Sequence, residues 1–212
     1  MTFSKNKIPM WIKLGFTGFM AILVPFYWTT YGPSNFLYFC DVALFLTLIG
    51  VWTENKLLIS LPAVGILIPQ FLWVIDFVGG FIGMHPIGMT DYMFDTNIPL
   101  FARGLSLFHG WLPFLLIYLV YKVGYDKRAF ANWTMIAWVL MIICYTLMPE
   151  PGTVLENINA PVNINYVYGL SDVEPQQWMH PHAWFAILMI GLPALFYYPT
   201  HKLLNSSFNK QR

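Results

Sequence analysis

Charged residues are scarce in this chain: they make up 10% of its 212 positions, against about 25% in an average soluble domain. Hydrophobic residues account for 58% of the chain and aromatic residues for 18%. This balance argues strongly against a soluble globular enzyme. It predicts an integral membrane protein, because only a bilayer accommodates so much apolar surface.

An excess of charge of one sign is also missing, since the net charge is +1. Neither nucleic acid nor an acidic substrate is therefore an expected partner. No glycine-rich phosphate loop and no internal repeat is evident, which argues against nucleotide chemistry and a repeat fold. The two cysteines, Cys40 and Cys144, fall inside apolar segments. They predict no disulfide framework.

What the sequence does contain is six apolar stretches of about 20 residues, the length that crosses a bilayer as a helix. Short polar or glycine- and proline-containing breaks separate them. We therefore expect an all-α fold, with residues 1–212 forming one domain of six transmembrane helices. The stretches are 9–30, 35–53, 57–79, 104–122, 131–148 and 182–199.

The distribution of lysine and arginine predicts the orientation of these helices, because cytoplasmic loops retain positive residues. With a cytoplasmic N-terminus, only Arg103 lies outside. Both termini are then cytoplasmic, and the long connections 80–103 and 149–180 face outward. No convincing cleavage site follows the first stretch, so we expect an uncleaved first helix. The inner residues are Lys5, Lys7, Lys13, Lys56, Lys122, Lys127, Arg128, Lys202, Lys210 and Arg212.

Three ionisable side chains lie within the apolar stretches near their predicted outer ends: Asp41, Asp76 and His109. A charged side chain such as Asp costs about 2.5–3.5 kcal/mol at the centre of a membrane helix, so it should face protein or water. Asp41 lies six residues into its stretch, about 9 Å from the outer end. His109 lies six residues beyond Arg103, at a similar depth.

Helical phase predicts that these groups line an outward-facing pocket between the segments 35–53, 57–79 and 104–122. The alternative is that Asp41 and His109 pair only to hold two helices together. The loop containing Asn163, Asn165, Tyr166 and Tyr168 is a candidate lid. The aligned residues are Ser34, Tyr38 and Asp41; Pro62, Gly65, Pro69, Trp73 and Asp76; and Ser106, His109, Gly110 and Pro113. The predicted pocket residues are Asn35, Tyr38, Asp76, Arg103, Ser106, Asn165 and Tyr166.

A second cluster, His180-Pro181-His182, begins the last apolar stretch. Two histidines with one residue between them can share a metal ion, with a carboxylate completing its ligands. In the alternative interpretation, Pro181 simply starts a helix and both imidazoles lie at the interface. No other cofactor is expected. The carboxylates available to such a metal are Asp41, Asp76, Asp91 and Asp95.

Cys40 lies about 100° around the helix from Asp41 and so at the margin of the pocket. A catalytic thiolate needs a nearby base or cation. The alternative is a small apolar side chain that fills space, and Cys144 fits that alternative too.

Three short patches carry a family resemblance: Asn35-Phe36-Leu37-Tyr38-Phe39-Cys40-Asp41, Ser106-Leu107-Phe108-His109-Gly110-Trp111, and Asn165-Tyr166. Together they resemble the YwaF-like bacterial integral membrane proteins, a family similar to a eukaryotic transmembrane acyltransferase. The resemblance implies that Cys40 matches the family's cysteine and His109 its histidine, and that the reaction is acyl transfer or hydrolysis on a lipid. The sequence departs from the family just before the cysteine, where Tyr38-Phe39 replaces a histidine-containing stretch.

The residues leave three functions open. In the first, the chain is a lipid-directed acyltransferase or hydrolase, with His109 as general base, Asp41 orienting it, and Cys40 or water as nucleophile. In the second it is not catalytic, and either binds a lipid or small ligand or serves as a subunit of a membrane complex. The third is a small transporter, although the repeat typical of carriers is missing. Membrane lipids and other membrane subunits are thus the expected partners.

Overall fold

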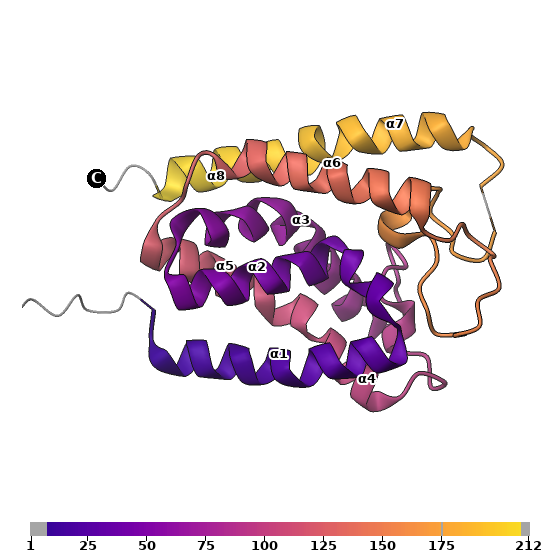
Figure 1. The fold of residues 1–212 in the computed structure, drawn as a ribbon, viewed down its shortest axis with the longest axis horizontal. Helices are drawn as coiled ribbons and strands as arrows, with labels where there is room; N and C mark the ends of the chain where they lie inside the picture. Colours follow the sequence, from indigo (N-terminus) through magenta and orange to yellow (C-terminus); the bar gives the residue numbers. More distant parts are fainter. Residues whose placement is uncertain (1–7, 175, 209–212) are drawn as a thin grey trace, which may run out of the picture.

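The computed structural model describes residues 8–174 and 176–208, and throughout these residues the regular secondary structure is helical. Consecutive long helices run in alternating directions along one bundle (Figure 1). The beginning of α1 and the end of α8 lie at the same end of the bundle, called here the terminal end; the opposite end, where the long connections gather, is called the loop end. The helices are α1 (Met10–Thr30), α2 (Phe39–Thr53), α3 (Lys56–Gly80), α4 (Leu100–Ser106), α5 (Phe108–Val123), α6 (Ala129–Leu147), α7 (Pro181–Leu192) and α8 (Tyr198–Phe208). Shorter 3-10 helical segments are Pro33–Leu37, Asp91–Met93 and Ile164–Tyr166, and a π-helical turn, Pro193–Tyr197, joins α7 to α8.

Five helical stretches are long and apolar enough to cross a membrane. The chain is therefore an all-α protein with the helices of a membrane protein, as the composition predicts. α2 is apolar but has only 15 residues, or about 22 Å at the usual rise, against a hydrocarbon core of about 30 Å. The five stretches are α1, α3, α4 with α5, α6, and α7 with α8.

α2 is shorter than the predicted segment 35–53 because its N-terminal part is not α-helical. Pro33 begins a 3-10 segment, and Tyr38 is extended, with ψ of 139°. The α-helix starts at Phe39, so Asp41 lies in its first turn rather than six residues deep. The predicted alignment of Ser34 with Tyr38 and Asp41 on one helical face is therefore wrong.

The segment 104–122 also differs from the prediction. Leu107 separates α4 from α5, so Ser106 ends one helix and His109 lies in the first turn of the next. His109 and Asp41 are nevertheless both near a helix start at the loop end, in agreement with the similar depth predicted for them.

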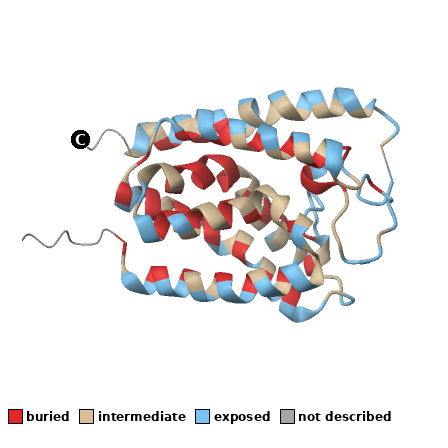
Figure 2. Cartoon of the chain, viewed as in Figure 1, coloured by how far each residue is buried: buried red, intermediate tan, exposed pale blue. Residues whose placement is uncertain are grey.

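α3 forms the centre of the bundle, and every residue from position 59 to 67 is buried. Figure 2 shows the buried residues concentrated on α3 and the exposed ones on the outer helices. The absence of a side chain at Gly65 leaves room for the indole of Trp133 on α6, because a Cβ at Gly65 would lie 1.8 Å from Trp133 Cε2. α7, in contrast, has no buried residue.

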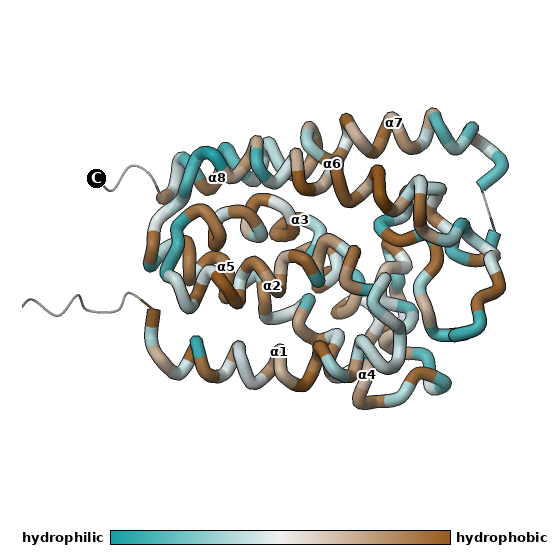
Figure 3. The backbone as a smooth tube through the Cα atoms, viewed as in Figure 1, coloured by the Kyte–Doolittle hydropathy of each residue, from teal (hydrophilic) through white to brown (hydrophobic). Residues whose placement is uncertain are grey.

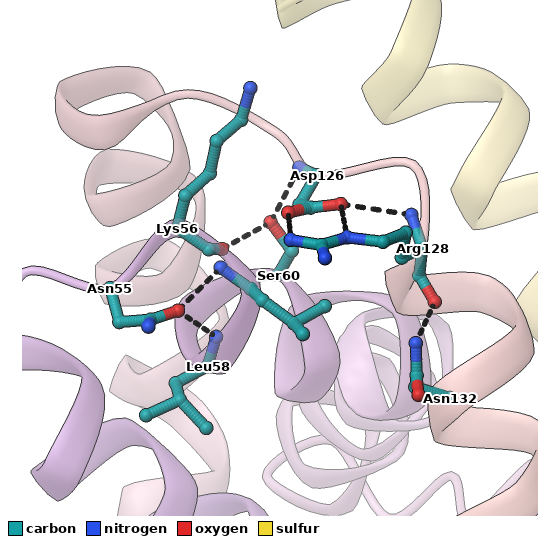
Figure 4. A network of polar contacts seen from close by, with 8 residues as sticks. Asn55, Lys56, Leu58, Ser60, Asp126, Arg128 and Asn132 are labelled. Atoms are coloured by element: carbon teal, nitrogen blue, oxygen red, sulfur yellow. Dashed lines mark hydrogen bonds and ion pairs between the residues drawn. The ribbon is translucent and has the colours of Figure 1, made fainter.

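Figure 3 shows apolar residues along the helices and hydrophilic ones towards their ends and in the connections. At the terminal end a polar network joins α3 to the connection before α6 (Figure 4). Asn55 caps α3, Ser60 Oγ accepts a bond of 2.9 Å from Asp126 N, and Asp126 pairs with Arg128 at 2.8 Å. The hydrogen bonds from Arg128 lower the pKa of Asp126 more than burial raises it.

Every lysine and arginine in the described parts of the chain except Arg103 lies towards the terminal end. This asymmetry agrees with the predicted distribution of positive charge. Lys5, Lys7, Lys210 and Arg212, which also entered that prediction, lie outside the described residues.

Candidate functional site

Aromatic and polar side chains from α1 to α5 and from the long connections meet at the loop end of the bundle. They are linked by the hydrogen bonds, ring contacts and electrostatic interactions described below. We call this group the loop-end cluster. Its members are Tyr27, Asn35, Tyr38, Cys40, Asp41, Trp73, Tyr92, Ser106, His109 and Tyr166.

His109 is held in one orientation by its own helix junction. Its Nδ1 lies 2.9 Å from the carbonyl oxygen of Ser106. Because a carbonyl only accepts hydrogen bonds, Nδ1 carries the proton, and Nε2 of the neutral ring keeps its lone pair. The ring also stacks on Trp73 and Phe108, with centroids 5.4 and 3.9 Å away. The orienting group is thus a backbone carbonyl, where the sequence predicted the carboxylate of Asp41.

Tyr92 joins the residues around His109 to the start of α2. Its hydroxyl accepts a bond of 3.2 Å from Trp73 Nε1 and also interacts with Ser106. Burial, with smaller contributions from Cys40 and Tyr166, raises the pKa of Tyr92 to about 12 against the opposing effect of these bonds. The cluster is therefore continuous from His109 to Cys40.

Sequence reasoning did not find Tyr92 or Tyr27. The Tyr27 hydroxyl lies 3.5 Å from Ser106 Oγ and so extends the cluster to α1. The alignment of Trp73 with Asp76 on one face of α3 was a signal for Trp73. Tyr92 lies in a long connection, where helical periodicity gives no information.

Asp41 is 3% exposed and only partly hydrogen bonded. Its Oδ2 accepts a bond of 3.3 Å from Asn35 Nδ2, but its Oδ1 is buried without a partner. No cationic side chain pairs with it within residues 8–174 and 176–208. The dipole at the start of α2 is the main local source of positive potential.

Cys40 is the second residue of α2 and is half-buried. It packs against the main apolar core and interacts electrostatically with Tyr92 and Tyr166 of the loop-end cluster. Cys144 belongs to a different apolar cluster around Met141 and Ile164, and its Sγ lies 3.5 Å from Asn165 Nδ2.

Asn165 holds the start of α2 from a distance of more than 120 residues along the chain. Its Oδ1 accepts a 3.0 Å bond from Phe39 N, and its Nδ2 donates a 2.9 Å bond to the Leu37 carbonyl. Asn165 and Tyr166 both have left-handed backbone angles, with φ of 59° and 57°. This conformation is rare for a bulky residue such as Tyr166 and often accompanies functional sites.

Tyr166, in the same loop, interacts electrostatically with Tyr38 and Tyr92 of the loop-end cluster. The residue is 43% exposed, yet burial raises the pKa of its phenol to about 12, with further contributions from Asp172 and Cys40. The predicted lid residues divide in their roles: Asn163 ties its own loop through Gly169 and Ser171, while Asn165 and Tyr166 reach α2 and the cluster.

Two predicted pocket residues are engaged elsewhere. Asp76 is fully buried and accepts four hydrogen bonds of 2.8–3.1 Å from the main chain at positions 87, 88 and 90 and the hydroxyl of Thr90. It therefore anchors the connection that carries Tyr92. Arg103 donates to the Met93 carbonyl at 3.0 Å, and its Nε is buried without a partner.

The two histidines of the predicted metal site serve the start of α7. His180 is the N-cap, with Nδ1 accepting from His182 N at 3.3 Å, and Pro181 is the first helical residue. His182 Nδ1 is hydrogen bonded to the Tyr145 hydroxyl. The helix-start alternative accounts for this arrangement. In the described part of the chain, no three histidine, cysteine or acidic side chains are placed to hold a metal ion.

The carboxylates predicted to complete that metal site also have other partners. Asp91 pairs with His85 at 2.8 Å, and Asp95 accepts hydrogen bonds from Asn97. Neither carboxylate therefore supplies a ligand beside His180 and His182.

Two shallow apolar clefts lie on the outside of the bundle. One is formed by α4 and ends one residue before Ser106 of the loop-end cluster; the other lies between α6 and the α7–α8 stretch. The first is lined by Leu100, Phe101, Gly104 and Leu105. The second is lined by Phe130, Trp138, Met189, Ile190, Pro193, Ala194 and Tyr198.

No family model matches the chain, and no curated protein or solved structure is significantly similar to it. The resemblance to YwaF-like proteins therefore stays a prediction based on the three sequence patches. The geometry of the loop-end cluster carries the functional argument.

Proposed function

We propose that this chain is a multi-pass protein of the bacterial cytoplasmic membrane, with six passes and cytoplasmic termini, that transfers or hydrolyses an acyl chain of a membrane lipid. The observation that carries the proposal is the state of His109. Its bond to the Ser106 carbonyl leaves Nε2 free to accept a proton, which is what a general base requires.

Cys40 is the proposed nucleophile. It lies in the first turn of α2, where the helix dipole favours a thiolate. His109 takes the thiol proton, the thiolate attacks the ester carbonyl carbon, and a C–S bond forms as the ester C–O bond breaks. The departing alcohol takes the proton from His109. Water or an acceptor alcohol then cleaves the thioester and regenerates Cys40.

The apolar cleft on α4 suits the acyl chain of such a substrate. Its lining consists of aliphatic and aromatic side chains and one glycine, and a lipid chain in the bilayer reaches it without crossing a polar surface. Ser106, a member of the loop-end cluster, lies on the same helix as this cleft.

A specific observation favours the non-catalytic alternative of a lipid-binding protein or complex subunit. No hydrogen bond joins Cys40 to His109 within the described residues. Catalytic hydrogen bonds are often long in ligand-free enzymes, so the absence of this bond is compatible with catalysis. A direct experiment is needed to distinguish the two functions.

The test uses purified protein in nanodiscs with a phospholipid that carries an alkyne-tagged acyl chain. We expect a hydroxylamine-sensitive label on the protein and release of the tagged chain as a free acid or a new ester. Cys40→Ala should lose both signals, whereas Cys144→Ala should keep them. His109→Phe, which preserves a stacking ring, should lower the rate at least 100-fold, about the minimum contribution of a general base. Tagged lipid that binds to wild type but is never cleaved would support the non-catalytic alternative.

A further inference from the structure

We propose that Asp41 and the tyrosines around it form a binding subsite for an organic ammonium group, carried by the head group of a membrane lipid. The inference rests on the proposed function only for the lipid as carrier. Binding at this subsite needs neither Cys40 nor His109.

The carboxylate of Asp41 is the first argument for a cationic ligand. It is 97% buried, since 3% of the residue is exposed, and Oδ1 has no hydrogen-bond donor. Its other oxygen has one donor, the Asn35 amide at 3.3 Å. A buried carboxylate with an unsatisfied oxygen is costly. An ammonium ion supplies both the missing donor and the compensating charge.

The aromatic surroundings are the second argument. Tyr27 and Tyr38 interact electrostatically with Asp41, and Tyr31 packs edge-on against Tyr27 with centroids 5.3 Å apart. Aromatic rings combined with a carboxylate bind organic ammonium ions, because ring faces attract cations and tolerate their alkyl groups. A small inorganic cation would need additional oxygen ligands.

Asn35 and Asp41 are buried, whereas Tyr38 and Tyr31 are half-buried and Tyr166 is 43% exposed. A head group would therefore approach Asp41 from the side of these tyrosines. The predicted outer interface is also where lipid head groups lie. The α4 cleft could hold the acyl chain of the same lipid, because α4 also carries Ser106, which lies 3.5 Å from the Tyr27 hydroxyl of the subsite.

The experiment is native mass spectrometry of detergent-purified protein with an equimolar mixture of phosphatidylethanolamine and phosphatidylglycerol of identical chains. We expect wild type to retain the ethanolamine lipid about tenfold over the glycerol lipid, the ratio given by one charge-assisted hydrogen bond. Asp41→Asn, which keeps the shape and the Asn35 contact, should bring the ratio close to one. Asp95→Asn, at the same end but bonded to Asn97, should keep the wild-type ratio.

Cys40→Ala separates this inference from the proposed reaction. A variant that neither forms a thioester nor cleaves lipid but still prefers the ethanolamine lipid would support the subsite by itself. An equal ratio in wild type, or an unchanged ratio in folded Asp41→Asn, would overturn the inference. If Asp41 is protonated and binds no cation, wild type will show no preference between the two lipids.

A wild-type measurement covers the case in which Asp41→Asn fails to fold. Methylammonium chloride should lower the retained ethanolamine lipid, whereas sodium chloride at equal ionic strength should not. Equal effects of the two salts would overturn the subsite. Free ethanolamine that binds as well as the lipid would keep the ammonium chemistry but assign it to a soluble amine.

Discussion

The indole of Trp184 on α7 donates a hydrogen bond of 2.8 Å to the carbonyl oxygen of Tyr166. Tyr166 has a left-handed backbone and interacts electrostatically with Cys40 of the loop-end cluster. α7 has no buried residue; partly buried apolar side chains pack it against the cluster around Met141 and Ile164, and polar contacts such as the Trp184 bond add to this packing. A movement of α7 is thus coupled to a residue of the proposed site.

Trp184→Phe tests this coupling, because it keeps a ring and removes the donor. We expect a loss of about 1 kcal/mol in the free energy of unfolding and faster modification of Cys40 by a maleimide in a Cys144→Ala background. Trp11→Phe, at a residue that is 73% exposed on α1, is the matched control. An unchanged rate at Cys40 would show that Trp184 does not hold Tyr166 at the site.

Asn165 is expected to be the loop residue most important for stability. Asn165→Ala leaves Phe39 N and the Leu37 carbonyl without their side-chain partner, which should cost about 1–3 kcal/mol. Asn165→Asp keeps the acceptor for Phe39 N but places a buried carboxylate oxygen against the Leu37 carbonyl, so its loss should be at least as large. Thermal melts in detergent measure the order, with exposed Asn132→Ala as control. Equal melting temperatures for all four proteins would contradict the capping role.

The sequence was sufficient to predict the helices and part of the site, because both depend on local pattern. Apolar length located five helical stretches long enough to cross a membrane, and the rule that buried ionisable groups face protein pointed to Asp41 and His109. The register failed at Tyr38 and Leu107, where a continuous helix was assumed across a 3-10 segment and a helix break.

Long-range polar contacts could not be predicted from the sequence. Asp76 has the composition and depth of a pocket residue, but the connection at positions 87–90 folds back and takes up its oxygens. Asn165 reaches Phe39 from 126 residues further along the chain. Such pairings depend on how connections fold, and neither helical phase nor hydropathy describes that.

Asp76→Asn should therefore disturb a connection rather than a ligand site. The variant replaces one carboxylate oxygen, an acceptor, with an NH2 group, a donor. That group would then face the donors of Thr90 or of the main chain at positions 87 and 88, and one hydrogen bond would be lost. We expect a loss of about 1–3 kcal/mol and faster proteolysis between positions 81 and 99. Asp95→Asn, in the same connection, should melt like wild type. A wild-type melting temperature for Asp76→Asn with loss of lipid binding would instead assign Asp76 to the pocket.

Gly65 is expected to be essential for packing α3 against α6. Gly65→Ala would place a methyl group 1.8 Å from Trp133 Cε2, and relief requires movement of a buried indole or of a helix. The cost of such overpacking is about 1–3 kcal/mol or more. Gly191→Ala is the control, because a Cβ there meets nothing within 4 Å and alanine favours the helix. A Gly65→Ala variant as stable as Gly191→Ala would disprove this close packing.

The attachment of α7 to α6 combines a proline with an indole. Pro193 has no N–H to offer the carbonyl of Met189 four residues earlier, and Trp138 Nε1 donates a 2.8 Å bond to that oxygen instead. Trp138→Phe should cost about 1 kcal/mol. In a Pro193→Ala background the restored main-chain donor can satisfy Met189, so the same change should cost less. A double-mutant cycle measured by denaturation in detergent gives the coupling energy, and a value of zero would show that Trp138 does not compensate for Pro193.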